Sequence, residues 1–198
     1  KIAWQKNNFN IKCINNITPG LKTKYYQHQE NLFYGLAEKG QASYSRKYFT
    51  LGTVTYLNEK KQIELLFQAV KKCLPVIPNL QLIIAGEGEE RKSLQWLAKK
   101  MEIDNLVWFV SEQANLKKWL DIFDVFIVAD ETLNLENINI IERAMSAGLP
   151  IIGPANIGLD DLVHHNENGL LFDIGDSEAI AEQIIKLQQD KRLRTKFG

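Results

Sequence analysis

Two adjacent lysines, Lys60 and Lys61, precede a run of apolar residues with helical spacing that begins at Ile63. The helix macrodipole disfavours positive charge at a helix N-terminus by about 0.3–1 kcal/mol. The same position favours a bound anion, because the first amide groups of a helix point toward it. The lysines therefore indicate either a phosphate site or a solvated pair offset by Glu59 and Glu64, and the residues alone favour neither.

A glycine pair, Gly86 and Gly88, follows the apolar run 80–85 and resembles the start of a dinucleotide fingerprint. Arg91 occupies the place of the third glycine of that motif. Two glycines alone are typical of a tight turn from strand to helix. We therefore predict a structural turn and no nicotinamide or flavin site. Close approach of the backbone to another ligand stays open.

Glu142 lies near the start of a second helical pattern, predicted over 140–147. Asn139 with Glu142 three residues later approximates a capping box, in which the glutamate serves the helix alone. A glutamate at this place is also able to accept hydrogen bonds from sugar hydroxyls. The residues themselves favour the cap.

Two adjacent histidines, His164 and His165, follow Asp160 and Asp161. Adjacent histidines rarely face one ion, and no second cluster has the spacing of zinc ligands. The chain has no Asp-x-Asp triplet to hold a divalent ion on a diphosphate, and no nucleophile elbow. We predict no metal site.

The elements that must position these residues alternate along the chain. Apolar runs predict buried strands at 48–55, 80–85, 106–110, 124–129, 149–152 and 170–172. Helical stripes lie between most of them, and a last stripe follows Asp176 as N-cap. Such alternation requires crossover connections, which build a mainly parallel sheet with helices on both faces. The predicted fold class is α/β, with a single Rossmann-like, doubly wound domain over 48–198.

Ligands of open α/β sheets bind beyond the carboxyl ends of the strands. This rule selects five segments of the chain: 56–61, 86–91, 110–113, 130–139 and 153–158.

Composition excludes several classes of protein. Of the 198 residues, 24 are Lys or Arg and 24 are Asp or Glu, so net charge gives no indication of nucleic acid. Cys13 and Cys73 lie in apolar runs and are predicted to be buried thiols. No apolar run reaches the roughly 20 residues that span a bilayer. We expect a cytoplasmic protein whose two ends are cuts in a longer chain, with 1–47 as an entry segment from a missing N-terminal domain.

Several segments in register resemble the donor domain of glycosyltransferase family 4, the retaining transferases of the GT-B fold. Over 48–198, the segments 57–62, 85–89 and 123–127 are similar to its lysine turn, its glycine turn and the strand that leads to its sugar site. Glu-Arg-Ala-Met-Ser-Ala-Gly-Leu-Pro at 142–150 is the most specific match, close to the family's Glu-Ala-Met-Ala-x-Gly-x-Pro. Further landmarks match at Gly158, Asp161, Asn168, Gly169 and Asp176.

The resemblance implies that Lys61 binds the donor diphosphate and that Glu142 binds the ribose. Two positions depart from the family. Tyr56 stands where the family has a second phosphate-binding cation, an arginine, and Asn134 stands where it has the glutamate that contacts the donor sugar. Lys61, Asn134 and Glu142 are the implied catalytic residues. The implied substrate-binding positions are Tyr56, Gly86, Val110, Ser111, Leu135, Glu136, Asn137 and Asn139, with Val110 and Ser111 at the base.

The resemblance further implies transfer of a sugar, with retention at the anomeric carbon, from a nucleotide sugar to an acceptor on the chain's own N-terminal domain. No cofactor or metal is expected. A UDP-linked donor is favoured over GDP- and ADP-linked ones, and membrane association through the missing domain stays open. Two alternatives remain: a degenerate domain that acts as a scaffold or regulatory subunit, and a Rossmann-like epimerase.

Overall fold

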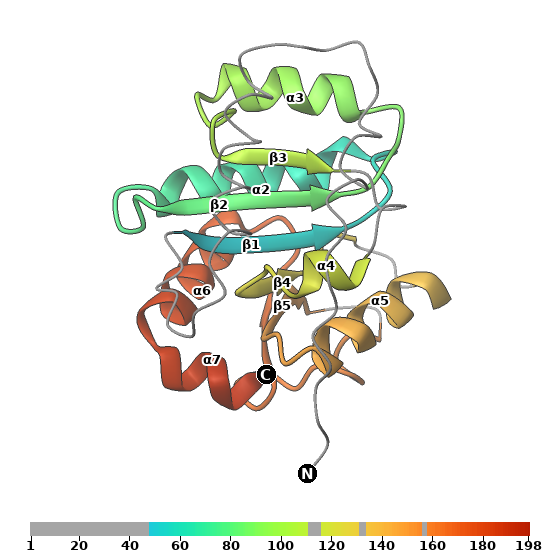
Figure 1. The fold of residues 1–198 in the computed structure, drawn as a ribbon, viewed down its shortest axis with the longest axis vertical. Coiled ribbons are helices and arrows are strands. Elements are labelled where there is room, and N and C mark those ends of the chain that lie inside the picture. The colour runs from blue at the N-terminus through green and yellow to red at the C-terminus, as the bar shows by residue number, and fades with distance from the viewer. Residues whose placement is uncertain (1–47, 111–115, 131–133, 156–157) are drawn as a thin grey trace, which may run out of the picture. The chain divides into compact units, whose positions relative to one another are not determined.

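Six parallel strands form the central sheet of the computed structural model, which describes residues 48–110, 116–130, 134–155 and 158–198. The strands are β1 (Phe49–Val54), β2 (Leu80–Ala85), β3 (Val107–Val110), β4 (Val125–Ile127), β5 (Ile151–Pro154) and β6 (Gly169–Phe172). Their order in the sheet is β3-β2-β1-β4-β5-β6 (Figure 1). The predicted α/β fold is confirmed, and each strand overlaps a predicted run.

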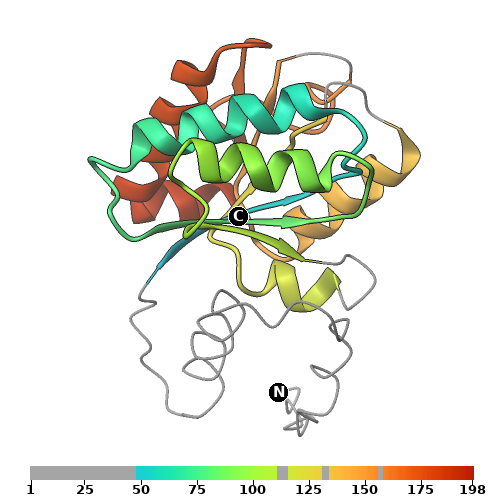
Figure 2. The same cartoon turned by 90° about the horizontal axis from the view of Figure 1, so that it is seen from above.

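The central strand β1 has no exposed face. All six of its residues are buried, the polar Thr50 and Thr53 included. Gly52 leaves room for an aromatic ring on one face, since a Cβ there would lie 2.0 Å from the ring of Phe123. Figure 2 shows α2 and α3 on one face of the strands and α4 on the other. Cover on both faces explains why the strands are continuous apolar runs rather than alternating ones.

The described helices follow the predicted stripes, with changes at their ends, except α7, which no predicted stripe covers. They are α2 (Lys60–Cys73), α3 (Arg91–Lys100), α4 (Leu116–Leu120), α5 (Leu135–Ser146), α6 (Ser177–Gln189) and α7 (Lys191–Phe197). The predicted N-cap of α6 is confirmed, because the side chain of Asp176 accepts hydrogen bonds from the amides of Glu178 and Ala179.

The predicted start of α5 is wrong. The helix begins at Leu135 instead of residue 140, and its N-cap is Asn134 rather than Asn139. Asparagine is a poor helix former, so three asparagines between 134 and 139 favoured a later start. In the folded chain Asn134 Oδ1 accepts a hydrogen bond from the Asn137 amide at 2.8 Å, which stabilises the early turn.

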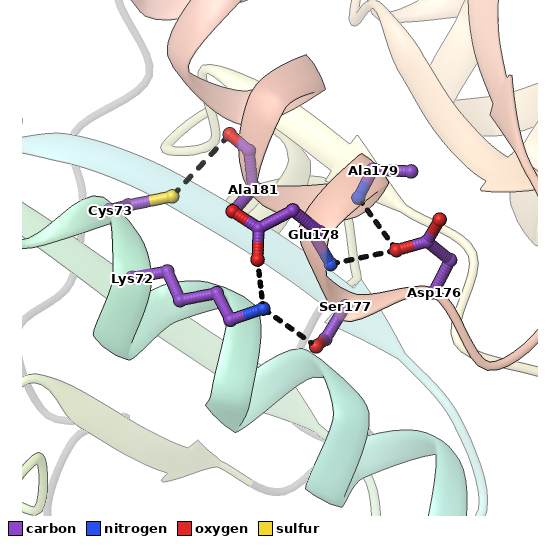
Figure 3. Close-up of polar contacts among 7 residues, drawn as sticks. All are labelled: Lys72, Cys73, Asp176, Ser177, Glu178, Ala179 and Ala181. Carbon is purple, nitrogen blue, oxygen red and sulfur yellow. Dashed lines mark hydrogen bonds and ion pairs between the residues drawn. The ribbon is translucent and has the colours of Figure 1, made fainter.

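Helix α6 packs against α2 at their buried sides (Figure 3). The Lys72 ammonium forms an ion pair with Glu178 and a 3.3 Å hydrogen bond with Ser177 Oγ. The buried Cys73 thiol lies 3.6 Å from the Ala181 carbonyl oxygen, to which it donates. Burial, followed by the negative charge of Glu178, raises the pKa of Cys73 to about 12. The predicted buried thiol is thus found for Cys73, while Cys13 lies outside the described residues.

Residues 1–47, with the predicted entry segment, also lie outside the described ranges, so that prediction stands as it was made. None of the described helices combines the length and the hydropathy that crossing a bilayer requires.

The Cys73 thiol is expected to resist modification in the native chain. In a Cys13→Ser variant at pH 8, a pKa of about 12 leaves roughly one Cys73 in ten thousand as the reactive thiolate. A colorimetric disulfide reagent should therefore react with Cys73 only after guanidinium denaturation, which serves as the positive control. Stoichiometric labelling within seconds in native buffer would contradict burial at the α2–α6 contact.

Candidate functional site at the carboxyl ends of β1 and β4

Strands β1 and β4 are neighbours, and the chain order reverses between them. From β1 the chain adds β2 and then β3 on one side, whereas β4, β5 and β6 follow on the other. At such a switch point the loops after the two strands turn in opposite directions and leave a crevice at their carboxyl ends. The segments after β1 and β4 are therefore the place where a ligand is expected.

Thr55 and Asp130 form the inner link across this crevice. The Thr55 hydroxyl, just after β1, donates a 2.6 Å hydrogen bond to Asp130 Oδ1, just after β4. Burial raises the pKa of the Asp130 carboxyl above its ordinary value; the Thr55 hydrogen bond opposes this rise, and the charge of Glu59 adds to it. A partly buried acid with a raised pKa beyond a strand end is the kind of group that is often found at functional sites.

Tyr56 and Glu136 form the outer link. The Tyr56 hydroxyl donates a 3.0 Å hydrogen bond to Glu136 Oε1 in the first turn of α5. Tyr56 is 52% exposed, so this contact lies at the solvent side of the Thr55–Asp130 pair. Two consecutive residues after β1 thus hold the segment after β4 at residues 130 and 136.

Helix α2 begins beside these links with a cationic and uncapped N-terminus. Its N-cap residue, Glu59, makes no side-chain hydrogen bond to the helix amides, and the first turn contains no acid. Lys60 is paired with Glu64 at 3.3 Å. Lys61 is exposed and forms no ion pair within the described part of the chain. The predicted lysine pair at a helix start is confirmed, and Lys61 is the member available to an anion.

The N-terminus of α5 is organised by Asn134. Because Asn134 Oδ1 binds the Asn137 amide, the amides of Leu135 and Glu136 remain as helix donors without an intrahelical acceptor. Leu135 is 81% exposed. Asn139 lies in the second turn, where its side-chain amide donates to the Leu135 carbonyl at 3.0 Å.

Glu142 is exposed two turns into α5, away from the helix start that the capping-box interpretation gave it. That interpretation is therefore wrong. The contact of Glu142 with a ribose remains a prediction.

Gly86 and Gly88 allow the backbone of the β1–α2 loop to approach closely. A Cβ at Gly86 would lie 1.9 Å from the Thr55 carbonyl oxygen, and one at Gly88 would lie 2.3 Å from the Leu57 carbonyl oxygen. The Arg91 guanidinium, at the place of the absent third glycine, donates to the Phe109 carbonyl at 2.9 Å. The predicted tight turn is confirmed, and the backbone that approaches these glycines is that of the segment carrying Thr55 and Tyr56.

Val110, another predicted position, is the last residue of β3. The Val110 carbonyl accepts the Gly86 amide at 3.0 Å, and Ser111 lies outside the described residues. His165 Nδ1 accepts the Leu171 amide at 3.0 Å, which gives this histidine a structural role. Within the described ranges, no three His, Cys, Asp or Glu side chains gather as metal ligands would.

Sequence reasoning selected the segment after β4 but did not single out Asp130, and it did not foresee the Thr55 and Tyr56 links. An acid directly after an apolar strand was the available signal for Asp130. The structure joins Tyr56, which lies four residues before α2, to Glu136, which lies two residues after the Asn134 cap. The site thus combines a lysine and helix amides, suited to an anion, with carboxylates that accept hydrogen bonds from hydroxyls.

A family model described as Glycosyl transferases group 1 matches residues 38–198. The lipopolysaccharide core biosynthesis glycosyltransferase LpsE of Rhizobium meliloti (strain 1021) is 31% identical over 140 residues, 71% of this chain and 39% of the relative. The N-acetyl-alpha-D-glucosaminyl L-malate synthase of Bacillus anthracis is 26% identical over 145 residues, 73% of this chain and 37% of the relative. The chain therefore spans less than half the length of these curated relatives.

Solved structures share the fold. The C-terminal domain of LpcC from Francisella tularensis, a glycosyl transferase group 1 family protein, superposes with a TM-score of 0.66 at 20% identity, over 75% of this chain and 80% of that one. HepE of Anabaena in complex with UDP-glucose gives a TM-score of 0.68 at 22% identity, over 90% of this chain and 46% of that one. The Rossmann-like sheet is thus a known architecture.

The partly buried Asp130 is expected to make stability depend on pH in a direction opposite to that of a salt-bridged acid. The native pKa of Asp130 is raised above the ordinary value of 3.8. Between the pKa of the unfolded chain and that of the native chain, the native state keeps a proton that the unfolded chain has released. The free energy of unfolding therefore falls as pH rises between these two pKa values. Asp130→Asn keeps an acceptor for Thr55 and cannot ionise. Denaturant titrations should therefore show the variant gaining stability relative to the parent chain from pH 3 to pH 7.

The same substitution at exposed Asp160 controls for the loss of one negative charge. Parallel pH profiles for Asp130→Asn and the parent chain would contradict burial of the ionised group.

Proposed function

Because this chain belongs to the glycosyl transferases of group 1, we propose that it is the donor-binding part of a retaining glycosyltransferase of family 4. It moves a sugar from a nucleoside diphosphate donor to an acceptor held by another domain of the protein. The observation that carries the proposal is that α2 and α5 follow β1 and β4, the neighbouring strands at the switch point of the sheet. The Tyr56–Glu136 hydrogen bond links them.

The donor diphosphate lies between these helix starts. Lys61 and the amide groups at the start of α2 neutralise part of its charge, and the Leu135 and Glu136 amides donate to its oxygens. As the bond from the anomeric carbon to the diphosphate breaks, negative charge grows on the leaving group. Fixed donors already aimed at that charge stabilise the transition state, without a metal ion.

The rest of the donor extends along the carboxyl edge of the sheet. The base lies toward Val110 and Ser111, beyond β3, and the ribose hydroxyls reach Glu142 on α5. UDP-linked donors are favoured, in line with HepE, whose structure was solved with UDP-glucose. GDP- and ADP-linked donors are the alternatives.

A second function is a scaffold or regulatory domain without transfer activity. Two observations favour it: Tyr56 supplies no positive charge to the diphosphate, and Glu136 adds a negative one at the first turn of α5. A domain of this kind would keep the fold and would gain no stability from nucleotides.

A thermal-shift panel with UDP, GDP, ADP and NAD separates the two functions. A ligand that binds only the native chain adds about 2.7 kcal/mol of stability at 100 times its dissociation constant. One nucleoside diphosphate is expected to raise the melting temperature, and Lys61→Ala and Glu142→Ala are expected to abolish most of the shift. Lys99→Ala, at an exposed lysine in the last turn of α3, is the matched control and should keep the full shift.

Stabilisation by none of the diphosphates at millimolar concentration would favour the scaffold. Stabilisation by NAD alone would contradict both functions.

A further inference from the structure

The hydrogen bond between Tyr56 and Glu136 joins two exposed side chains that lie 80 positions apart in the sequence. A hydrogen bond exposed to water adds little to stability, because water replaces it when the chain unfolds. What the bond does fix is geometry: it holds a carboxylate at the start of α5, on the solvent side of the β1–β4 crevice. The pair therefore fixes the position of a carboxylate more than it stabilises the fold.

Asn134, the residue expected to contact the donor sugar, is also the N-cap of α5. Its side-chain oxygen is bound to the Asn137 amide and caps α5. Glu136 is the acidic residue of the same turn, and the positive end of the helix dipole stabilises its charge. A carboxylate has about four acceptor sites, and Tyr56 occupies one of them. The others are suited to a pair of neighbouring hydroxyls.

We propose that Glu136 is the residue that binds the sugar of the donor and that Tyr56 is its positioning residue. This inference rests on the proposed function and deepens it. Sugar hydroxyls donate to Glu136, while the Tyr56 hydroxyl keeps the carboxylate in one orientation and so lowers the entropy cost of binding. The carboxylate repels the diphosphate. Its favourable contribution to the binding free energy therefore comes from the sugar alone.

This arrangement gives one explanation for both departures from the family pattern. Tyrosine in place of arginine removes a phosphate contact and provides the hydroxyl that holds Glu136. Asparagine in place of glutamate removes one carboxylate and caps the helix that presents another. The two substitutions are then parts of one altered sugar site rather than separate losses.

The test compares each nucleotide sugar with its own nucleoside diphosphate by calorimetric titration of the chain: UDP-glucose with UDP, GDP-mannose with GDP, and ADP-glucose with ADP. For the pair that binds, Glu136→Gln is expected to weaken the nucleotide sugar about tenfold relative to the diphosphate, as loss of a charged hydrogen bond does. Tyr56→Phe is expected to reduce the same ratio, the affinity for the nucleotide sugar divided by that for its diphosphate, by a smaller factor of about three. Glu182→Gln, at an exposed glutamate of α6, should leave the ratio unchanged.

The ratio separates this inference from the proposed function. If diphosphates bind and Glu136→Gln changes both ligands equally, or neither, Glu136 does not bind the sugar and only the inference falls. If Glu136→Gln tightens the nucleotide sugar, the carboxylate obstructs the site and the inference is again overturned. If no pair binds to the parent chain, the proposed function falls together with it. Unchanged melting temperatures without ligand establish that the variants are folded.

Discussion

The end of β1 is the fixed point of the candidate site, because it is hydrogen-bonded on both sides. Toward β2, the Thr55 amide donates to the Ala85 carbonyl at 3.1 Å, and Gly86 lets the two segments come close. Toward β4, the Thr55 side chain donates to the partly buried Asp130. A residue held in this way cannot shift without breaking contacts in two directions. The next residue, Tyr56, therefore follows a backbone position that is held in place.

The same constraint couples helix starts that are far apart in the sequence. The loop after β1 leads into α2 and its lysines, and the segment after β4 leads into α5. Thr55 and Tyr56 bind the second segment at residues 130 and 136, so the two helix N-termini keep a defined separation. An anion between them would meet donors that are already oriented, and orientation before binding is what makes such donors effective.

The balance of charges in the crevice distinguishes this chain from a simple anion site. Lys61 is the cation left available at α2, whereas Asp130 and Glu136 bring carboxylates to the opposite wall. Burial keeps the pKa of Asp130 raised, which reduces its negative charge at a given pH. Glu136 is exposed and its charge is screened by water. Such a crevice suits a ligand that has both an anionic part and a hydroxylated part, as a nucleotide sugar has.

The sequence by itself determined the fold class, the six strands, the turn at Gly86 and the lysines at the start of α2, because hydrophobic period and glycine placement are local properties. It also directed attention to the carboxyl ends of the strands. Only the tertiary structure decided that α5 begins at Leu135, that Asn134 caps it, and that Tyr56 holds Glu136. The Tyr56–Glu136 contact spans 80 positions, so no local pattern encodes it. The Asn134 cap is local, but Asn139 offered an equally local alternative, and weak helix propensity did not choose between the two.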